Sequence, residues 1–436
     1  MNTIENQEPV VSIGIDAAVV AAHQVAIRGP GIAEDFRVRP TLAGLEELTV
    51  RLADWAPAMV VAEPTAGTWL PLLHAITESG CRAGFVANRD SARLRKAIAG
   101  ANKTAVIDVD LLARSPEILG VEQAPIPPAG QIGLRRAMRR QHRAIVDAHR
   151  VDCRLWALAA WAFPDVWRAC GGHGVAQPVL GRWSDIRALG RARTATVAEV
   201  VAAHSRDKNP ARRAERIKAG AGGWSEFWLG RLDLDDLAWE VGQCLDDIAI
   251  ADAKLAATTE RALDRWQQLW PDDVLPTIPG IGPICAASIR GWWGEGTHLR
   301  SAKAAAAHVG LNPSNWESGQ YRSPSRHITK QGPADLRLLL YQAANVGRHH
   351  DPGLAAHYRR LMCDRGHTHI SATSAIARKL AGRAWKILQT QQPYEVRDLD
   401  GNPIDPITAR AICTELAVPA DTRRRNRATQ QGRLTP

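Results

Sequence analysis

The sequence predicts an α/β domain, a helical middle and a mainly helical C-terminal domain. Short apolar runs alternate with segments of helical period at the N-terminus, as in a mixed sheet flanked by helices. Two long stretches of helical period follow, and Gly- and Pro-bounded helical segments fill the last third. A chain of 436 residues exceeds one ordinary core. We therefore expect domains at 1–130, 131–270 and 271–395, and a basic tail at 396–436.

In the first domain, the runs predict specific strands and helices. Apolar runs with turn residues between them predict strands at 10–16, 23–27, 35–38, 59–63 and 82–87. Helical spacing predicts helices at 42–53, 68–79 and 90–99. A mixed sheet with helices against it is the expected result.

Three acids of this domain form a candidate catalytic and metal site. Asp16 and Glu63 end two of the apolar runs, and Asp108 lies in the first turns of a helix within 101–114. Each acid alone is more commonly a strand-end or N-cap carboxylate. In this order they favour a shared site, because Mg²⁺ prefers carboxylate oxygens. Two such ions stabilise both the attacking and the leaving oxygen of a phosphodiester.

The middle region contains two long helices. A Pro-rich stretch at 115–130 predicts a linker, and an amphipathic helix rich in Arg and His is expected at 132–161. A second helix at 234–270 is rich in acids. We expect an antiparallel coiled coil, basic side against acidic, with an apolar stripe used for dimerisation. Between them, 170–224 is Gly- and Arg-rich and predicts one helix near 197–204.

The C-terminal domain opens with IPGIGP at 278–283. Gly280 and Gly282 would let backbone N–H groups approach a phosphate at a helix N-terminus. The alternative is a tight turn between helices. Further helices are expected at 284–290, 304–309, 334–347 and 371–389, and the Arg-rich end at 423–427 is expected to be disordered.

Ser318 is a candidate nucleophile. It lies in a Gly-flanked loop with three cations, Arg322, Arg326 and Lys330. A serine placed there could attack a phosphodiester while the cations stabilise the phosphorane. The alternative is a loop serine that caps the backbone. Lys103, just before the Asp108 helix, is a further candidate contact to nucleic acid.

Composition points to a polyanionic partner. The formal net charge is +10, which favours nucleic acid or an unspecific basic surface. The seven cysteines are scattered without a CxxC pair, which is typical of a reducing cytoplasm. The polar N-terminus is unlike a secretory signal, and no apolar run is long enough to span a bilayer. We therefore expect a cytoplasmic protein.

The chain resembles the insertion-sequence-110 family of DEDD transposases, the bridge-RNA-guided recombinases. The similar stretches are GIDAA at 14–18, AEPTAGTWLPLL at 62–73, NKTAVIDVDLLAR at 102–114, IPGIGPICAAS at 278–288, HVGLNPSNWESGQYRSPSRHITKQG at 308–332 and LRLLLYQAA at 336–344. The resemblance implies a RuvC-like, ribonuclease-H-like domain, a coiled coil and a transposase domain. It implies a metal site at Asp16, Glu63 and Asp108, and a phosphoserine link through Ser318. Its implied partners are donor and target DNA, a structured guide RNA and a tetramer of the chain.

One position departs from the family pattern. The family helix reads KTDxxDA, whereas this chain has Ala105 where the third acid is expected. An Asp there would lie one helical turn before Asp108, on the same face. Asp110 is a poor substitute, because two residues rotate the side chain by about 200°. The alanine indicates a weakened metal site in an inactive protein, a deliberate replacement that traps a complex with uncut DNA, which we favour, or a natural degenerate copy.

Two other functions compete with RNA-guided recombination. One is a RuvC-like nuclease that hydrolyses DNA junctions and needs no covalent intermediate. The other is a non-catalytic nucleic-acid-binding protein, which Ala105 favours. Ser318 separates the first alternative from the recombinase, because only the recombinase uses it as a nucleophile.

Overall fold

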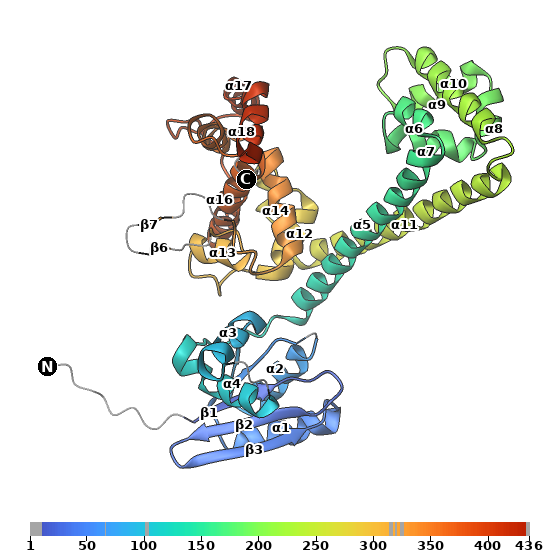
Figure 1. Cartoon of the computed structure of the whole chain (residues 1–436). Coiled ribbons are helices and arrows are strands. Elements are labelled where there is room, and N and C mark those ends of the chain that lie inside the picture. The colour runs from blue at the N-terminus through green and yellow to red at the C-terminus, as the bar shows by residue number, and fades with distance from the viewer. Residues whose placement is uncertain are drawn as a thin grey trace. The chain divides into compact units, whose positions relative to one another are not determined.

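The computed structural model describes residues 11–65, 67–100, 104–313, 317–318, 321–322 and 327–432. The chain divides into two compact units, Met1–Pro127 and Pro128–Pro436. The first is mixed α/β and the second is almost entirely helical (Figure 1). The coiled-coil and C-terminal regions expected from the sequence both fall in the second unit.

A five-stranded mixed sheet is the centre of the first unit. Its order is β3-β2-β1-β4-β5, with β1 antiparallel to β2, β2 antiparallel to β3, and β1, β4 and β5 parallel. Figure 1 labels β1, β2 and β3 of this sheet. All five strands expected from the sequence are confirmed: β1 (Ser12–Asp16), β2 (His23–Gly29), β3 (Ile32–Val38), β4 (Met59–Ala62) and β5 (Arg82–Phe85).

Helices pack on both faces of this sheet. Alternate strand residues such as Ile13 and Val60 face a core shared with helices α1 (Leu42–Ala53) and α2 (Trp69–Glu78). The opposite face is covered by α4 (Ala105–Leu119), whose Leu112 packs with Met59 and Val61. Helix α3 (Asn88–Ile98) packs against α4. The predicted helices of this unit are confirmed.

The linker expected at 115–130 begins later than predicted. Helix α4 continues to Leu119, with Pro116 inside it, and ends where Gly120 adopts a φ of 62°. A proline removes the N–H that would bond the carbonyl four residues earlier, here that of Leu112. The hydroxyl of Ser115 donates to that carbonyl at 2.6 Å instead. The Ser115 hydroxyl thus replaces the missing N–H as the donor to Leu112, and the helix continues through Pro116.

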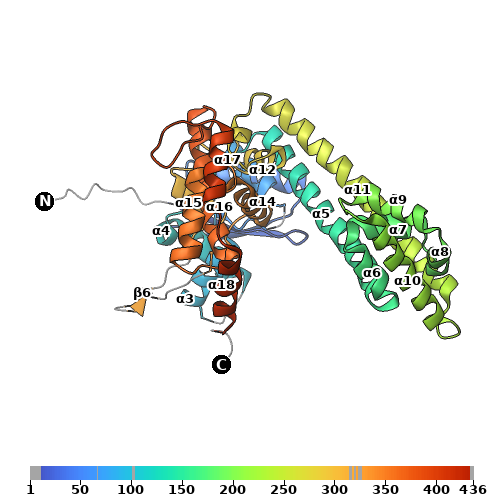
Figure 2. The same cartoon turned by 90° about the horizontal axis from the view of Figure 1, so that it is seen from above.

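Two long helices of the second unit lie side by side, as predicted. Helix α5 (Ala129–Ala162) packs along α11 (Leu234–Leu269), as both views show (Figures 1 and 2). Leu134 and Met138 of α5 share a core with Ala262 and Trp266 of α11, so the apolar stripe serves this intrachain contact. Charge adds little, because the cross-helix pair Arg154–Asp247, at 3.5 Å, is exposed.

A helical lobe joins α5 to α11, and the sequence predicted only part of it. It contains α6 (Pro164–Cys170), α7 (His173–Arg182), α8 (Ile186–Arg191), α9 (Thr194–His204) and α10 (Pro210–Trp228). Only α9 was predicted, because the glycines of this stretch read as breaks. The basic run at 212–218 lies in α10, where Ala214 and Ile217 are buried and Arg213 donates to the carbonyl of Ala169.

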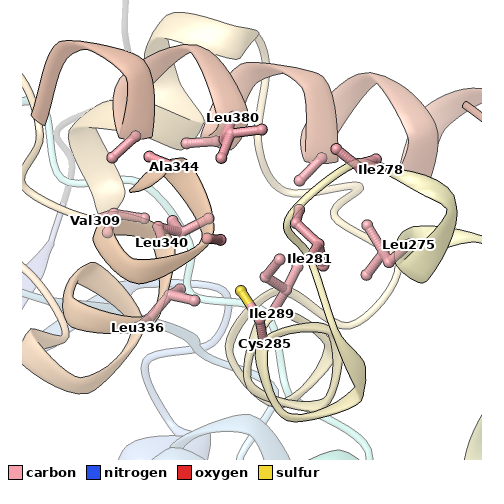
Figure 3. Packing of buried hydrophobic residues seen from close by; sticks show 14 of the residues in the cluster. Leu275, Ile278, Ile281, Cys285, Ile289, Val309, Leu336, Leu340, Ala344 and Leu380 are labelled. Carbon is pink, nitrogen blue, oxygen red and sulfur yellow. The ribbon is translucent and has the colours of Figure 1, made fainter. Parts of the chain in front are cut away.

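The C-terminal domain is a helical bundle with one apolar core. Its elements are η1 (Leu275–Thr277), α12 (Pro283–Trp293), α13 (Ala302–His308), α14 (Ala334–Gly347), α15 (Pro352–Arg359), the π-helical turn η2 (Arg360–Asp364) and α16 (His369–Thr390). Figure 3 shows Ile281 and Cys285 from the start of this domain meeting Leu340 of α14 and Leu380 of α16. The four helices predicted here are confirmed, whereas α15 was missed.

The expectation of a disordered C-terminal tail is wrong. Residues 406–432 form α17 (Pro406–Glu415) and α18 (Ala420–Gly432). Thr422 and Asn426 of α18 are buried, and the Asn426 amide donates to the carbonyls of Met362 and His367. The high Arg content of this segment suggested a solvated tail, so the sequence did not reveal that one face of α18 packs against the domain. None of the helices in the described ranges is long and apolar enough to cross a membrane.

Candidate functional site

Two of the three predicted acids lie at neighbouring strand ends. Side chains alternate along a strand, so Asp16 shares the face of Gly14, opposite Ile13 and Ile15. Because β1 and β4 run parallel with Ile15 beside Ala62, Asp16 and Glu63 follow at the same edge. Glu63 likewise alternates onto the face of Val61, which α4 covers. The sheet thus directs both carboxylates to the side where α4 lies.

Gly14 fixes how closely α4 approaches this face. A Cβ atom on Gly14 would lie 2.2 Å from the Val109 carbonyl oxygen and 2.5 Å from the Ala113 nitrogen. No other residue permits such an approach of helix and strand backbones. Thr104 starts the helix by accepting the Ile107 N–H at 3.2 Å. Asp108, next to Val109, is thereby carried to the sheet on a rigid element.

Side chains of α3 hold two of the acids. The Ser91 hydroxyl donates to the Glu63 carboxylate, and the Arg95 guanidinium donates to Asp108 at 2.7 Å. The hydrogen bond to Asp108, together with the charges of Asp108 and Glu63, raises the pKa of Arg95. One turn of α3 therefore engages a strand-end acid and the helix acid together.

The three acids suit a hard cation by chemistry, but here Asp108 already has a cationic partner. Within the described residues, no three His, Cys, Asp or Glu side chains are gathered closely enough to hold a metal ion. A shared metal site at Asp16, Glu63 and Asp108 therefore stays a prediction. Ala105, where the family has an acid, is the exposed first residue of α4, one turn before Asp108.

Asp110 faces away from the other acids, as the helical period predicts. Its carboxylate pairs with Arg28 of β2 at 2.7 Å and with Arg114 at 3.0 Å. Asp108, two residues earlier, pairs instead with Arg95 of α3. Asp110 thus fastens α4 to the antiparallel side of the sheet and does not replace the missing acid.

The described segments that flank the Ser318 loop pair closely with each other. Strand β6 (Glu317–Ser318) pairs with β7 (Tyr321–Arg322), Ser318 opposite Tyr321. Below them, the Lys330 N–H donates to the Gly310 carbonyl at 3.1 Å. A Cβ on Gly332 would lie 1.9 Å from the His308 carbonyl oxygen, so the two chain segments touch there. This close pairing fixes where the loop leaves the domain.

Several predicted contacts of this region fall partly or wholly outside the described residues. The backbones of Ser318 and Arg322 are described but their side chains are not, and Lys103 and Arg326 lie outside the described ranges. Lys330 is exposed at the loop base with a φ of 54°. The roles of these residues stay predictions.

The glycines of the IPGIGP turn serve different ends. Gly280 has a φ of 93°, and a Cβ on it would lie 2.2 Å from the Ala343 carbonyl oxygen of α14. The absence of a side chain on Gly280 thus allows the turn to pack against the backbone of α14, which favours the interpretation as a tight turn between helices. Gly282 caps α12, and a Cβ there would meet nothing within 4 Å. A phosphate contact of either glycine stays a prediction.

Sequence reasoning missed a basic cavity beside the base of the serine loop. It has a volume of about 600 Å³ and is lined by Arg139, His142 and Arg143 of α5, with Trp292, His308 and Gly332 among the rest. The Arg and His side of the 132–161 helix was the available signal. The helical periodicity of the sequence could not show that this side of α5 lies beside His308 and Gly332.

Trp292 and its neighbours build the wall of this cavity. The Arg135 guanidinium lies 4.8 Å from the centroid of the Trp292 ring. Burial first, then the charges of His298 and Arg135, lower the pKa of His308 to about 4. His308 is therefore neutral near pH 7 and accepts the Trp293 indole N–H at 3.2 Å. Trp293 itself is buried in the core.

Comparison with known proteins assigns a family to the C-terminal domain. Residues 272–359 match the family model described as "Transposase IS116/IS110/IS902 family". The transposase for insertion sequence element IS1328 of Yersinia enterocolitica is 34% identical over 116 residues, which are 26% of this chain and 34% of that protein. The pilin gene-inverting protein of Moraxella lacunata is 30% identical over 127 residues, 28% of this chain and 38% of that protein.

A Streptomyces coelicolor relative extends the comparison. The "Insertion element IS110 uncharacterized 43.6 kDa protein" is 29% identical over 124 residues, 28% of this chain and 30% of that protein. The matched segments thus span about a third of the relatives' own lengths. The matched domain carries the serine loop, its base and part of the basic cavity wall. Residues 272–359 are thus similar to the IS116/IS110/IS902 transposase family.

Proposed function

We propose that this chain is the transposase of an insertion sequence and recombines DNA strands under the guidance of a structured RNA. The observation that carries the proposal is the transposase match at 272–359, which includes the Ser318 loop. A relative whose name is that of a gene-inverting protein supports recombination as the reaction class. The net charge of +10 supports nucleic acid as the partner.

Ser318 is the proposed nucleophile. Its oxygen attacks the scissile phosphorus, the Ser318 O–P bond forms, and the bond from phosphorus to the sugar oxygen breaks. The serine proton leaves as the sugar hydroxyl gains one, so a phosphoserine and a free hydroxyl result. Arg322, Arg326 and Lys330 bind the phosphate oxygens during this exchange. Reversal of the step on another strand end joins the new DNA.

The first unit is the proposed RuvC-like partner of this serine. Its strand order, with three parallel strands beside an antiparallel pair and α4 across β1, supports this assignment. Asp16, Glu63 and Asp108 are the residues that would hold Mg²⁺, and Arg95 is the competing cation at Asp108. The ion supplies charge stabilisation to the oxygens of the phosphodiester. Lys103, Gly280 and Gly282 are proposed contacts to the nucleic-acid backbone.

We propose a tetramer as the working form, so that the carboxylates of one protomer act with the serine of another. Donor and target DNA pair with the guide RNA, while the protein contacts backbone and shape. Ala105 weakens the carboxylate site, so this chain is proposed to be slow or inactive as it stands.

Restoring the missing acid tests the proposal. The variant Ala105→Asp is incubated with Mg²⁺, co-purified RNA and supercoiled plasmids that carry the element ends, and recombinant junctions are counted. We expect at least a tenfold gain over the parent chain, with a covalent protein–DNA adduct that the added change Ser318→Ala abolishes.

Two results would redirect the assignment. Cleavage with free DNA ends that persists after Ser318→Ala indicates a junction nuclease. Binding of nucleic acid with no strand exchange by Ala105→Asp indicates a non-catalytic protein.

A further inference from the structure

A second basic groove lies in the C-terminal domain, and its lining residues include neither the three acids nor any residue of the serine loop. It has a volume of about 640 Å³ and is lined by residues of α13, α15 and α16. Figure 1 labels α13 and α16, and Figure 2 labels α15 and α16. Lys303 comes from α13 and His357 from α15, and the other charged residues come from α16. Helix α16 lies beyond the matched residues 272–359, so the match assigns it nothing.

The groove has cations at its rim and small residues at its floor. Lys303, Arg378, Lys379 and Lys386 line it, and no acidic side chain does. Ala302, Ala306 and Gly382 are the small residues of the lining, and a Cβ on Gly382 would lie 3.1 Å from that of Ala302. The floor is therefore closed by close helix packing, while the rim presents ammonium and guanidinium groups.

Helical period explains why the cations share one side of α16. Arg378, Gly382 and Lys386 recur every four residues, whereas Leu380 and Ala384 on the opposite side are buried in the core. Packing of α16 accounts for the apolar side alone. Nothing in that packing requires the groove side of α16 to carry four cations.

The cations of the groove are poorly neutralised. In the part of the chain that the structure describes, Lys303, Arg378, Lys379 and Lys386 have no ion pair. Arg383 alone among the lining cations is paired, with Asp351 at 2.8 Å.

Burial and the nearby cations lower the pKa of two groups of the groove, Lys379 and His357. Burial, then the charges of Arg383 and Arg360, lower the pKa of Lys379. Burial, followed by the charges of Lys379 and Arg360, lowers the pKa of His357 to about 4. Like charges at this spacing repel each other, and a bound polyanion would remove that cost.

We infer that this groove binds the sugar-phosphate backbone of double-stranded DNA, independently of sequence. The inference rests on the proposed function for its choice of DNA. Four unpaired cations suit successive phosphates, and none of the lining residues is Trp, Tyr or Phe on which an unpaired base would stack. The groove thus adds a backbone contact that positions a duplex on the transposase domain.

A triple variant of the full-length chain tests the inference. Arg378→Gln, Lys379→Gln and Lys386→Gln are combined, and binding to a fluorescent duplex that lacks the element ends is measured against salt. Each phosphate contact contributes about 0.9 to the slope of log affinity on log salt. We expect the slope to fall by roughly 2 to 3 and the affinity to fall about tenfold for each contact at 0.1 M salt.

A matched control removes the same charge elsewhere. Arg206→Gln, Lys208→Gln and Arg212→Gln lie in and near α10 and are all exposed. The control should keep most of the slope, and Lys379→Arg should keep the affinity because its charge remains. Melting temperatures of all variants are compared to establish that the fold is intact.

Several outcomes would overturn the inference. They are an unchanged slope in the triple variant, an equal loss in the control, and a loss confined to single-stranded or duplex RNA. Recombination by Ala105→Asp separates this idea from the proposed function. If that variant recombines while the groove variant binds duplex normally, the groove inference alone fails. If it does not recombine but the groove variant loses duplex binding, the proposed function alone fails.

Discussion

Replacing Gly14 by alanine should displace the helix that carries Asp108. Gly14 lies on β1 two residues before Asp16, with the backbone of α4 directly against it. The added Cβ would lie 2.2 Å from the Val109 carbonyl oxygen and 2.5 Å from the Ala113 nitrogen. Both atoms belong to helix backbone, so no side-chain rotation relieves the clash.

The size of the effect follows from these two contacts. Ordinary van der Waals contact begins near 3.4 Å, so α4 must move by about 1 Å. Overpacking of this kind costs about 1–3 kcal/mol, and two backbone contacts favour the upper end. For a unit of this size, that corresponds to a fall in melting temperature of roughly 10 °C. A displacement of about 1 Å in a catalytic group lowers activity by roughly 100-fold.

Thermal unfolding by circular dichroism measures the first effect, and recombination in the Ala105→Asp background measures the second. Gly67→Ala is the control, because a Cβ there meets nothing within 4 Å and its backbone needs no positive φ. A melting temperature for Gly14→Ala equal to that of the control would refute the packing argument. Normal stability with lost activity would show instead that Gly14 acts in the chemistry.

The remaining predictions concern one buried pair, one histidine and one arginine. Arg290→Leu leaves Asp273 buried without its partner at 3.0 Å, and urea unfolding should show a loss of about 3–5 kcal/mol; a loss below about 1 kcal/mol contradicts this. His308, with a folded pKa of about 4, binds its proton later than the unfolded chain does, which titrates near 6.5. Stability should therefore fall as pH drops from about 6.5 to 4, and an NMR titration midpoint above about 6 would oppose this. Arg95→Ala frees the Asp108 carboxylate, so calorimetry should detect Mg²⁺ binding roughly fivefold tighter, and weaker binding would show that Arg95 supports the site.

The sheet and the strand-end acids were predictable from short-range patterns. Apolar runs ending in Asp16 and Glu63 defined β1 and β4, and parallel pairing then brought the two acids together. Thr104 before a helical run marked the start of α4. These features depend on a few neighbouring residues, which is why the sequence alone reveals them.

Other parts depend on contacts between distant segments. The 164–228 lobe reads as glycine-rich coil, yet its helices are stabilised by a shared apolar core with α5 and α11. Helix α18 gains its place through Asn426, which bonds carbonyls about 60 residues away in sequence. The basic cavity joins α5 to the 308–332 segment in the same way. The periodicity of neighbouring residues carries no information about such contacts between distant segments.

The Ser91 and Arg95 contacts indicate how Ala105 affects Asp108 even without a bound metal ion. Arg95 is one cation that lies against Asp108 and feels the charge of Glu63. A fourth carboxylate at position 105 would add negative charge one turn from Asp108, more than a single guanidinium can balance. A divalent ion would then be favoured over Arg95. With alanine there, Arg95 suffices for Asp108, so the metal-free arrangement is stabilised. At the proposed metal site, alanine at position 105 would thus both lack a carboxylate ligand and favour Arg95 as the partner of Asp108, and Ala105→Asp should reverse both effects together.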